Sequence, residues 1–127
     1  MKKEIIKTPN APAAIGPYSQ AVKAGGMLYC SGQIALDPKT GEFAGNDITS
    51  QTEQVMKNIS AILEEAGCTF SDVVKCHIFL ATMGDFAVVN EIYGRYFTEN
   101  PPARETVAVK TLPKNALVEI SCIAIAD

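Results

Sequence analysis

The chain has 127 residues, 47% apolar and 20% charged, a composition typical of one soluble domain that is large enough to hold its own hydrophobic core. Eleven Lys and Arg against fourteen Asp and Glu give a net charge of −3 with no basic block, which argues against a nucleic-acid or anionic-membrane surface. No apolar run approaches the roughly 20 residues of a membrane span, so we expect a single cytoplasmic domain over residues 1–127.

The first predicted elements are a strand and then a β-hairpin, whose two strands lie at residues 19–24 and 27–34. Gly25 and Gly26 lie between the strands, and glycine readily adopts the positive φ angles of a type I′ turn. This turn pairs residues whose numbers sum to 51, which predicts a polar face at the far end of the hairpin. That face consists of Tyr18, Gln20, Ser31 and Gln33.

A long helix is predicted after a Pro- and Gly-marked loop at residues 38–45. It begins at Asp47 or at the capping box of residues 50–53, where a hydroxyl and a Glu three residues later can satisfy free backbone N–H groups. Gly67 suits a left-handed C-terminal cap. The buried stripe of this helix is expected to consist of Val55, Ile59, Ile62 and Ala66.

The second half of the chain predicts a strand, a helix and two closing strands. Residues 73–80 read as an interior strand, apolar on nearly both faces. A helix then runs from Thr82 or Asp85 to the prolines at 101–102, and the closing strands cover residues 103–109 and 117–126. The uninterrupted apolar side of the strand at residues 73–80 is expected to consist of Val74, Cys76, Ile78 and Leu80.

The elements together predict an α/β (α+β) domain with a mixed, mostly antiparallel sheet and two helices on one face. Two helices cover only one face of such a sheet, so the other face meets water or another subunit. The last strand is apolar on both sides, because Ile123 and Ile125 alternate with its inward residues. We therefore expect oligomerisation through the uncovered face.

The four cysteines and the single histidine do not match a metal or redox motif. The cysteines are separated by 38, 8 and 46 residues, and no CxxC motif is present, which favours buried free thiols. His77 alternates with Lys75 and Phe79, with no second ligand at metal spacing, so we expect a hydrogen-bonded or exposed imidazole and no metal. The cysteines are Cys30, Cys68, Cys76 and Cys122.

Two charged residues stand out against this apolar background. Glu119 interrupts the last strand, and a buried carboxylate needs a cation, a water or a ligand as its partner. Arg104 follows two prolines that stiffen the start of its strand, and its planar guanidinium can hold both oxygens of a small carboxylate. Taken alone, Arg104 is also compatible with a surface charge or a structural ion pair.

Four segments in chain order carry a resemblance to a known family. They are NAPAAIGPYSQA at 10–21, SGQI at 31–34, PAR at 102–104, and LP at 112–113 followed by VEI at 118–120. Together these segments resemble the RidA/YjgF family of imine deaminases over almost the whole chain. The resemblance implies a chorismate-mutase-like fold, a homotrimer with sites between subunits, and no cofactor. It also implies hydrolysis of 2-imino acids and their enamine tautomers to 2-oxo acids and ammonia.

The resemblance implies a role for each of several residues. Arg104 falls on the family's substrate-binding arginine, and Glu119 on its water-handling glutamate. Tyr18 and Ser31 fall on cleft positions, although an interface tyrosine and a structural strand hydroxyl are the alternatives for these two. Thr106 stands where the family often has cysteine, and its backbone N–H still supplies the donor to the substrate carboxylate.

The implied substrates are 2-iminobutanoate and 2-iminopropanoate, which pyridoxal-phosphate-dependent serine and threonine dehydratases release. Gly32 allows backbone to approach this site closely, or marks a β-bulge. An alternative function is a non-catalytic trimer that binds small carboxylic acids or acts as a chaperone. A ribonuclease is disfavoured by the single histidine and the net charge of −3.

Overall fold

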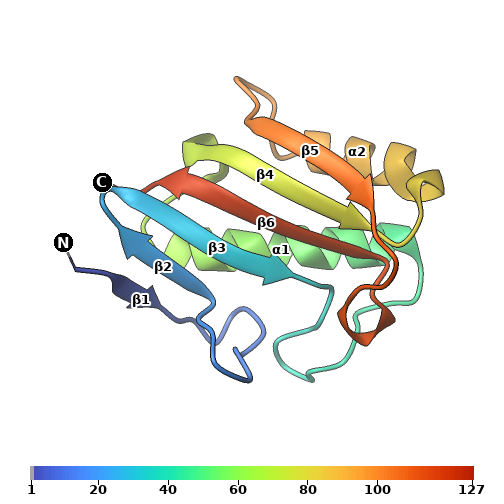
Figure 1. Ribbon diagram of the computed structural model, residues 1–127, viewed down its shortest axis with the longest axis horizontal. Helices are drawn as coiled ribbons and strands as arrows, with labels where there is room; N and C mark the ends of the chain where they lie inside the picture. Colours follow the sequence, from blue (N-terminus) through green and yellow to red (C-terminus); the bar gives the residue numbers. More distant parts are fainter. Residues whose placement is uncertain (1) are drawn as a thin grey trace.

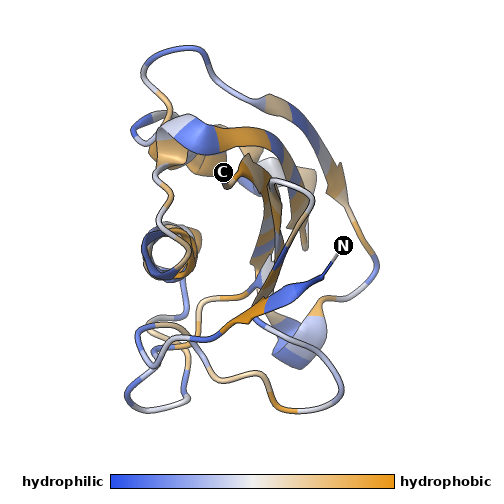
Figure 2. Cartoon of the chain, turned by 90° about the vertical axis from the view of Figure 1, so that its left-hand side faces the viewer, coloured by the Kyte–Doolittle hydropathy of each residue, from blue (hydrophilic) through white to orange (hydrophobic). Residues whose placement is uncertain are grey.

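A computed structural model describes residues 2–127, which form one six-stranded sheet with two α-helices on a single face (Figures 1 and 2). The strand order is β1-β2-β3-β6-β4-β5; β4 and β5 run parallel, and the other neighbours run antiparallel. Neither helix of residues 2–127 has the length and apolar character needed to cross a membrane. The elements are β1 (Glu4–Ile6), β2 (Ala21–Ala24), β3 (Met27–Gln33), α1 (Ile48–Glu65), β4 (Val73–Leu80), α2 (Phe86–Gly94), β5 (Ala103–Ala108) and β6 (Val118–Ile125).

The predicted hairpin turn is confirmed, but the predicted pairing does not extend to Tyr18 and Gln33 at its far end. Gly25 and Gly26 have φ angles of 59° and 78°, and β2 pairs with β3 in the predicted register. However, β2 begins only at Ala21, so Tyr18 does not face Gln33. Tyr18 is 54% exposed, whereas Gln33 is 6% exposed.

Two local features explain this departure. The buried amide of Gln20 donates hydrogen bonds to the carbonyls of Thr8, Ala11 and Pro12 at 2.8–3.2 Å, which fixes this side chain to the N-terminal segment. The backbone carbonyl of Gln20 still accepts a hydrogen bond of 2.9 Å from the N–H of Ser31, so the contact with β3 ends just before Tyr18. In addition, the register between β3 and β6 shifts between Cys30 and Gln33. This bulge turns the side chain of Gln33 towards the core, because one extra residue reverses the alternation of a strand.

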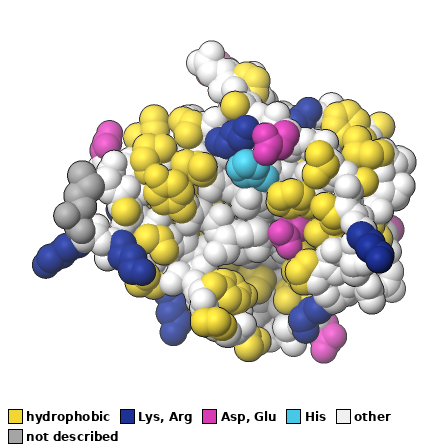
Figure 3. All heavy atoms as spheres, viewed as in Figure 1, with side chains coloured by type: hydrophobic (Ala, Val, Ile, Leu, Met, Phe, Trp, Pro, Cys, Tyr) yellow, Lys and Arg dark blue, Asp and Glu magenta, His cyan; other side chains and the backbone are white. Residues whose placement is uncertain are grey.

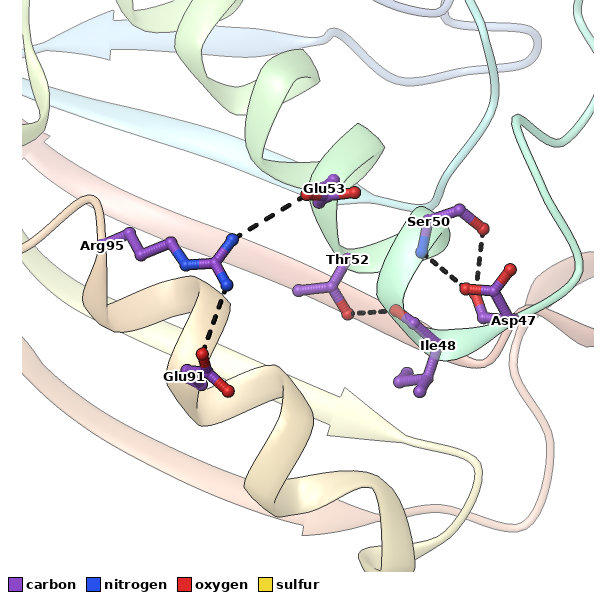
Figure 4. A network of polar contacts seen from close by, with 7 residues as sticks. All are labelled: Asp47, Ile48, Ser50, Thr52, Glu53, Glu91 and Arg95. Atoms are coloured by element: carbon purple, nitrogen blue, oxygen red, sulfur yellow. Dashed lines mark hydrogen bonds and ion pairs between the residues drawn. The ribbon is translucent and has the colours of Figure 1, made fainter.

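Helix α1 begins and ends where the capping signals predicted. The carboxylate of Asp47 accepts a hydrogen bond of 2.8 Å from the N–H of Ser50 (Figure 4). Gly67, with φ of 77°, follows the helix in the left-handed conformation. All four residues of the predicted stripe are buried against the sheet. Arg95, just after α2, pairs with Glu53 of α1 and Glu91 of α2, so the two helices are also linked at the surface.

Two predictions for β4 and α2 need correction. Val74 is 38% exposed, because the register of β4 against β6 shifts between Val73 and Lys75 and carries Val74 out of the apolar side. Helix α2 ends at Gly94, well before the prolines. The two aromatic residues that the longer helix would have contained, Tyr96 and Phe97, pack instead against the ring of Phe70 at 5.0 and 5.3 Å between centroids.

The sheet face opposite the helices is uncovered and carries apolar and polar side chains (Figure 3). All four cysteines are free and buried, as predicted. His77 lies on the open face, where its Nδ1 is 2.7 Å from a carboxylate oxygen of Glu105, which also pairs with Lys75. Of the two predicted alternatives for His77, a hydrogen-bonded or an exposed imidazole, the hydrogen-bonded one is found. The large exposed apolar side chains of this face include Ile5, Tyr29, Val107 and Ile125.

Candidate active site

Glu119 lies on the open side of β6 and lines a cleft of about 640 Å³. Tyr18, Ser31 and Gly32 line the same cleft, so four of the predicted site residues come together here. The side chain of Glu119 is half-buried, and its burial raises the pKa of the carboxyl above the ordinary glutamate value. Among residues 2–127, no ion pair or hydrogen bond offsets this effect. The carboxyl is therefore available to a water or a ligand.

Gly32 provides the space in which the Glu119 carboxylate lies. A Cβ atom at residue 32 would be 2.6 Å from Oε2 and 2.8 Å from Cδ of Glu119, closer than real Cβ atoms approach other atoms. Gly32 also belongs to the segment in which the β3–β6 register shifts. Gly32 therefore lies both at a bulge and at a place of close approach, so the two interpretations of this glycine are compatible.

The segment that carries Tyr18 is fixed over the sheet by polar contacts. The N–H of Thr8 donates to the side-chain oxygen of Gln20 at 2.7 Å, in addition to the three bonds from the Gln20 amide. The hydroxyl of Ser31 donates to the carbonyl of Ser19 at 2.6 Å, so its hydrogen is already used within the chain. Tyr18 itself stays exposed at the mouth of the cleft.

A loop before β6 forms the far wall of this cleft and contributes a cation. Lys114 lines the cleft and has a positive φ of 55°, in a turn anchored by the buried side chains of Leu112 and Ala116. Gln51 of α1 accepts a hydrogen bond of 2.9 Å from the N–H of Leu117, which fixes the entry of the chain into β6. The resemblance includes Leu112 and Pro113 of this loop, but nothing in the sequence indicated that Lys114 lines the cleft.

Arg104 lies elsewhere, on the edge strand β5 and on the helix side of the sheet. Its register partner is Cys76, whose side chain faces the core. The guanidinium lies over the rings of Phe86 and Tyr93, 5.6 and 5.1 Å from their centroids. Its Nη1 donates a hydrogen bond of 2.6 Å to Oδ1 of Asn90, and no carboxylate of residues 2–127 is within ion-pair distance. Arg104 thus remains a net cation beside a hollow of about 460 Å³.

The backbone beside Arg104 offers a further donor. In the parallel pair of β4 and β5, the N–H of Val109 donates to the carbonyl of Leu80 at 2.9 Å. Because alternate residues of an edge strand point their N–H groups to its single neighbour, the N–H of Thr106 faces the free edge. The hydroxyl of Thr106 is buried without a hydrogen-bond partner among the described residues.

The structure separates the predicted site into two halves within one chain. Arg104 faces the helix side of β5, whereas Glu119 faces the open side of β6, with β4 between the two strands. Arg104 and Glu119 are two strands apart, and their register partners in β4, Cys76 and Phe79, are three residues apart. These two separations place the Cα atoms of Arg104 and Glu119 roughly 14 Å apart. A single copy of the chain therefore cannot place both side chains on one small substrate.

The comparisons with known proteins agree with this architecture. The model of the Endoribonuclease L-PSP family matches residues 8–126. The chain is 46% identical over 123 residues to a mouse protein named 2-iminobutanoate/2-iminopropanoate deaminase, covering 97% of this chain and 91% of the mouse chain. The chain belongs to the RidA/YjgF family. Some members of this family are named imine deaminases, and others carry only general family names.

Two further comparisons illustrate the RidA/YjgF family. A RutC family protein of Pyrococcus horikoshii is 56% identical over 122 residues, covering 96% of this chain and 97% of its own. The crystal structure of Escherichia coli TdcF with bound serine has a TM-score of 0.93 and 39% identity, covering 98% of this chain and 99% of that chain. The mixed sheet with two helices is therefore the fold of a solved family member.

Asn90 is the residue near Arg104 that the sequence did not single out. It lies on α2 four residues after Phe86 and three before Tyr93, so these three side chains share one face of the helix. A polar residue within an aromatic stripe was a signal that could have drawn attention to it. Its contact with Arg104 depends on how α2 packs against β5, which the sequence pattern does not reveal.

Proposed function

We propose that this protein hydrolyses 2-imino acids and their enamine tautomers to 2-oxo acids and ammonia. The proposed substrates are 2-iminobutanoate and 2-iminopropanoate, released by pyridoxal-phosphate-dependent serine and threonine dehydratases. One observation carries the proposal: a guanidinium with no acidic partner among the described residues lies beside a free backbone N–H, and a half-buried carboxyl with a raised pKa lies in a separate cleft. These are the groups that an imino acid needs at its carboxylate and at its C=N carbon.

We further propose a homotrimer in which each site forms between two copies. The separation of Arg104 from Glu119 supports this arrangement, because a second copy can bring its Arg104 to the Glu119 cleft of the first. The uncovered sheet face supports it too, since exposed apolar side chains such as Tyr29 and Ile125 gain stability when buried. A cyclic arrangement repeats the same pair of surfaces around the ring.

Arg104 holds the substrate carboxylate in this proposal. Its guanidinium can donate two parallel hydrogen bonds to one carboxylate, and the N–H of Thr106 adds a third donor at the strand edge. These bonds orient the imine carbon and keep it in place for attack. Imines hydrolyse unaided in water, so positioning and proton transfer are sufficient for catalysis without a covalent intermediate.

Glu119 handles the water in this proposal. It accepts a proton from the water as oxygen bonds to the imine carbon, and it delivers a proton to the nitrogen, which gives a carbinolamine. The same transfer from the new hydroxyl to the nitrogen then breaks the C–N bond and releases ammonia and the 2-oxo acid. The raised pKa supports this double role, because a carboxyl that titrates closer to neutral pH both accepts and returns protons.

A coupled assay tests the proposal directly. Purified protein is added to a threonine or serine dehydratase, and the appearance of the 2-oxo acid is followed in time. We expect faster release of the 2-oxo acid, in proportion to the amount of protein added. Unchanged kinetics would instead favour the alternative, a trimer that binds small carboxylic acids or acts as a chaperone without turnover.

A further inference from the structure

Helix α2 presents a row of three side chains to Arg104. Phe86, Asn90 and Tyr93 follow one another at spacings of four and three residues, which aligns them along one face. The two rings lie 5.6 and 5.1 Å from the guanidinium carbon, and the amide oxygen between them accepts the 2.6 Å bond from Nη1. Three separate contacts from one helix therefore define the position of a single exposed cation.

The bond to Asn90 also determines which part of the guanidinium remains free. A guanidinium has five N–H donors in a planar fork, and a carboxylate binds two parallel donors along one edge. With Nη1 engaged by the amide, the edge formed by Nε and Nη2 is left for a bidentate partner. The contacts with the two aromatic rings restrain the guanidinium further, so the free edge has a restricted range of directions.

The neutrality of Asn90 has its own consequence. Asp has nearly the same shape and an equivalent acceptor oxygen, but its charge would pair with Arg104 and compete with an anionic ligand. The neighbouring acidic residue, Glu91, turns to Arg95 at 3.3 Å and does not pair with Arg104 (Figure 4). Arg104 is thus bound firmly by a group that leaves its full positive charge available.

We propose that Asn90 is a positioning residue that orients Arg104 and leaves its positive charge uncompensated for the carboxylate of the substrate. This inference rests on the proposed function, since it assigns Arg104 the carboxylate. Under this inference, the affinity for a monoanion depends on Asn90, whereas the chemical step does not. It also predicts that charge at residue 90 matters more than shape.

Two variants and one control test the inference. Asn90→Ala removes the acceptor, Asn90→Asp keeps the shape and adds a negative charge, and Glu91→Gln changes the charge of the adjacent exposed residue. The readouts are KM and kcat in the coupled assay, and the Kd of 2-oxobutanoate, the stable product, by calorimetry. Circular dichroism and size-exclusion chromatography check fold and assembly. Asn90 is exposed, so each variant is expected to fold.

We expect Asn90→Ala to raise KM and Kd about tenfold with kcat within about twofold, because one hydrogen bond to a charged group is lost. Asn90→Asp should raise both about 100-fold, and Glu91→Gln should leave both unchanged. The order is decisive, because a purely structural role predicts that the isosteric Asp is better tolerated than Ala.

Wild-type Kd in the Asn90→Asp variant, or a weaker effect of Asp than of Ala, would overturn the inference while leaving a deaminase intact. A wild-type protein without turnover would overturn the proposed reaction alone, provided that 2-oxobutanoate still binds and the order of Kd values holds. Absence of binding to the wild type would remove both proposals.

Discussion

Gly32→Ala is a sharp test of the Glu119 cleft. A Cβ atom at residue 32 would lie 2.6 Å from Oε2 of Glu119, whereas ordinary contacts begin at 3.4 Å, so the carboxylate must move by about 0.8 Å. A displacement near 1 Å at a reacting group lowers a rate about 100-fold. We therefore expect kcat/KM in the coupled assay to fall about 100-fold, a loss of ~2.7 kcal/mol of transition-state stabilisation.

The fold should tolerate this change, which separates its effect from unfolding. Gly32 does not have a positive φ, so Ala can adopt its backbone conformation, and the side chain that must yield is the flexible end of Glu119. We expect the free energy of unfolding to change by less than ~1 kcal/mol. Gly84→Ala is the matched control, because its Cβ would lie 3.5 Å from Oγ1 of Thr82, an ordinary contact.

The measurements are kcat/KM and thermal unfolding of both variants beside the wild type. If Gly32→Ala keeps kcat/KM within about threefold of the wild type at unchanged Tm, the carboxylate does not need its present position. That result would refute the role of Glu119. Loss of activity in the Gly84→Ala control as well would show that the assay reports a general effect of the substitution.

Three further outcomes follow from the two halves of the site. Arg104→Ala should raise KM at least about 100-fold, with assembly retained in size-exclusion chromatography. Arg104→Lys should recover only part of the lost affinity, because an ammonium cannot bind a carboxylate in the same bidentate way. A wild-type KM in the Ala variant would show that Arg104 is not part of the site. Glu119→Gln should lower kcat by about 100-fold or more in single-turnover measurements. The same variant should raise Tm at pH 7, and the gain should vanish as the pH falls to the ordinary glutamate pKa near 4.3, because burial penalises only the ionised carboxyl. A lower Tm at pH 7 would contradict the raised pKa.

Local signals explain why much of the fold was predictable. Gly25 and Gly26 determine a turn, and through it the register of a hairpin, while Asp47 and Gly67 mark the two ends of α1. The order of the strands depends instead on contacts distant in sequence. Nothing within residues 118–125 indicates that β6 inserts between β3 and β4, because its alternation is compatible with several neighbours.

The candidate site shows the same limit at the level of single residues. Glu119 stands out by its charge in an apolar strand, and its face follows from the alternation of β6. Arg104 lies on a strand that is mostly exposed on both faces, so only the register with β4 reveals that it points to the helices. Val74 and Tyr18 departed from expectation because a bulge and a buried glutamine amide override simple alternation.

A mixture of two inactive variants tests directly whether each site forms between two copies of the chain. Arg104→Ala and Glu119→Gln chains, carrying different affinity tags, are co-expressed in equal amounts, and mixed oligomers are allowed to form at random. If each site takes Arg104 from one copy and Glu119 from its neighbour, about one quarter of the sites are intact, and activity returns to about 25% of the wild type. Activity no higher than that of the separate variants, in oligomers shown to contain both tags, would contradict a site formed between copies.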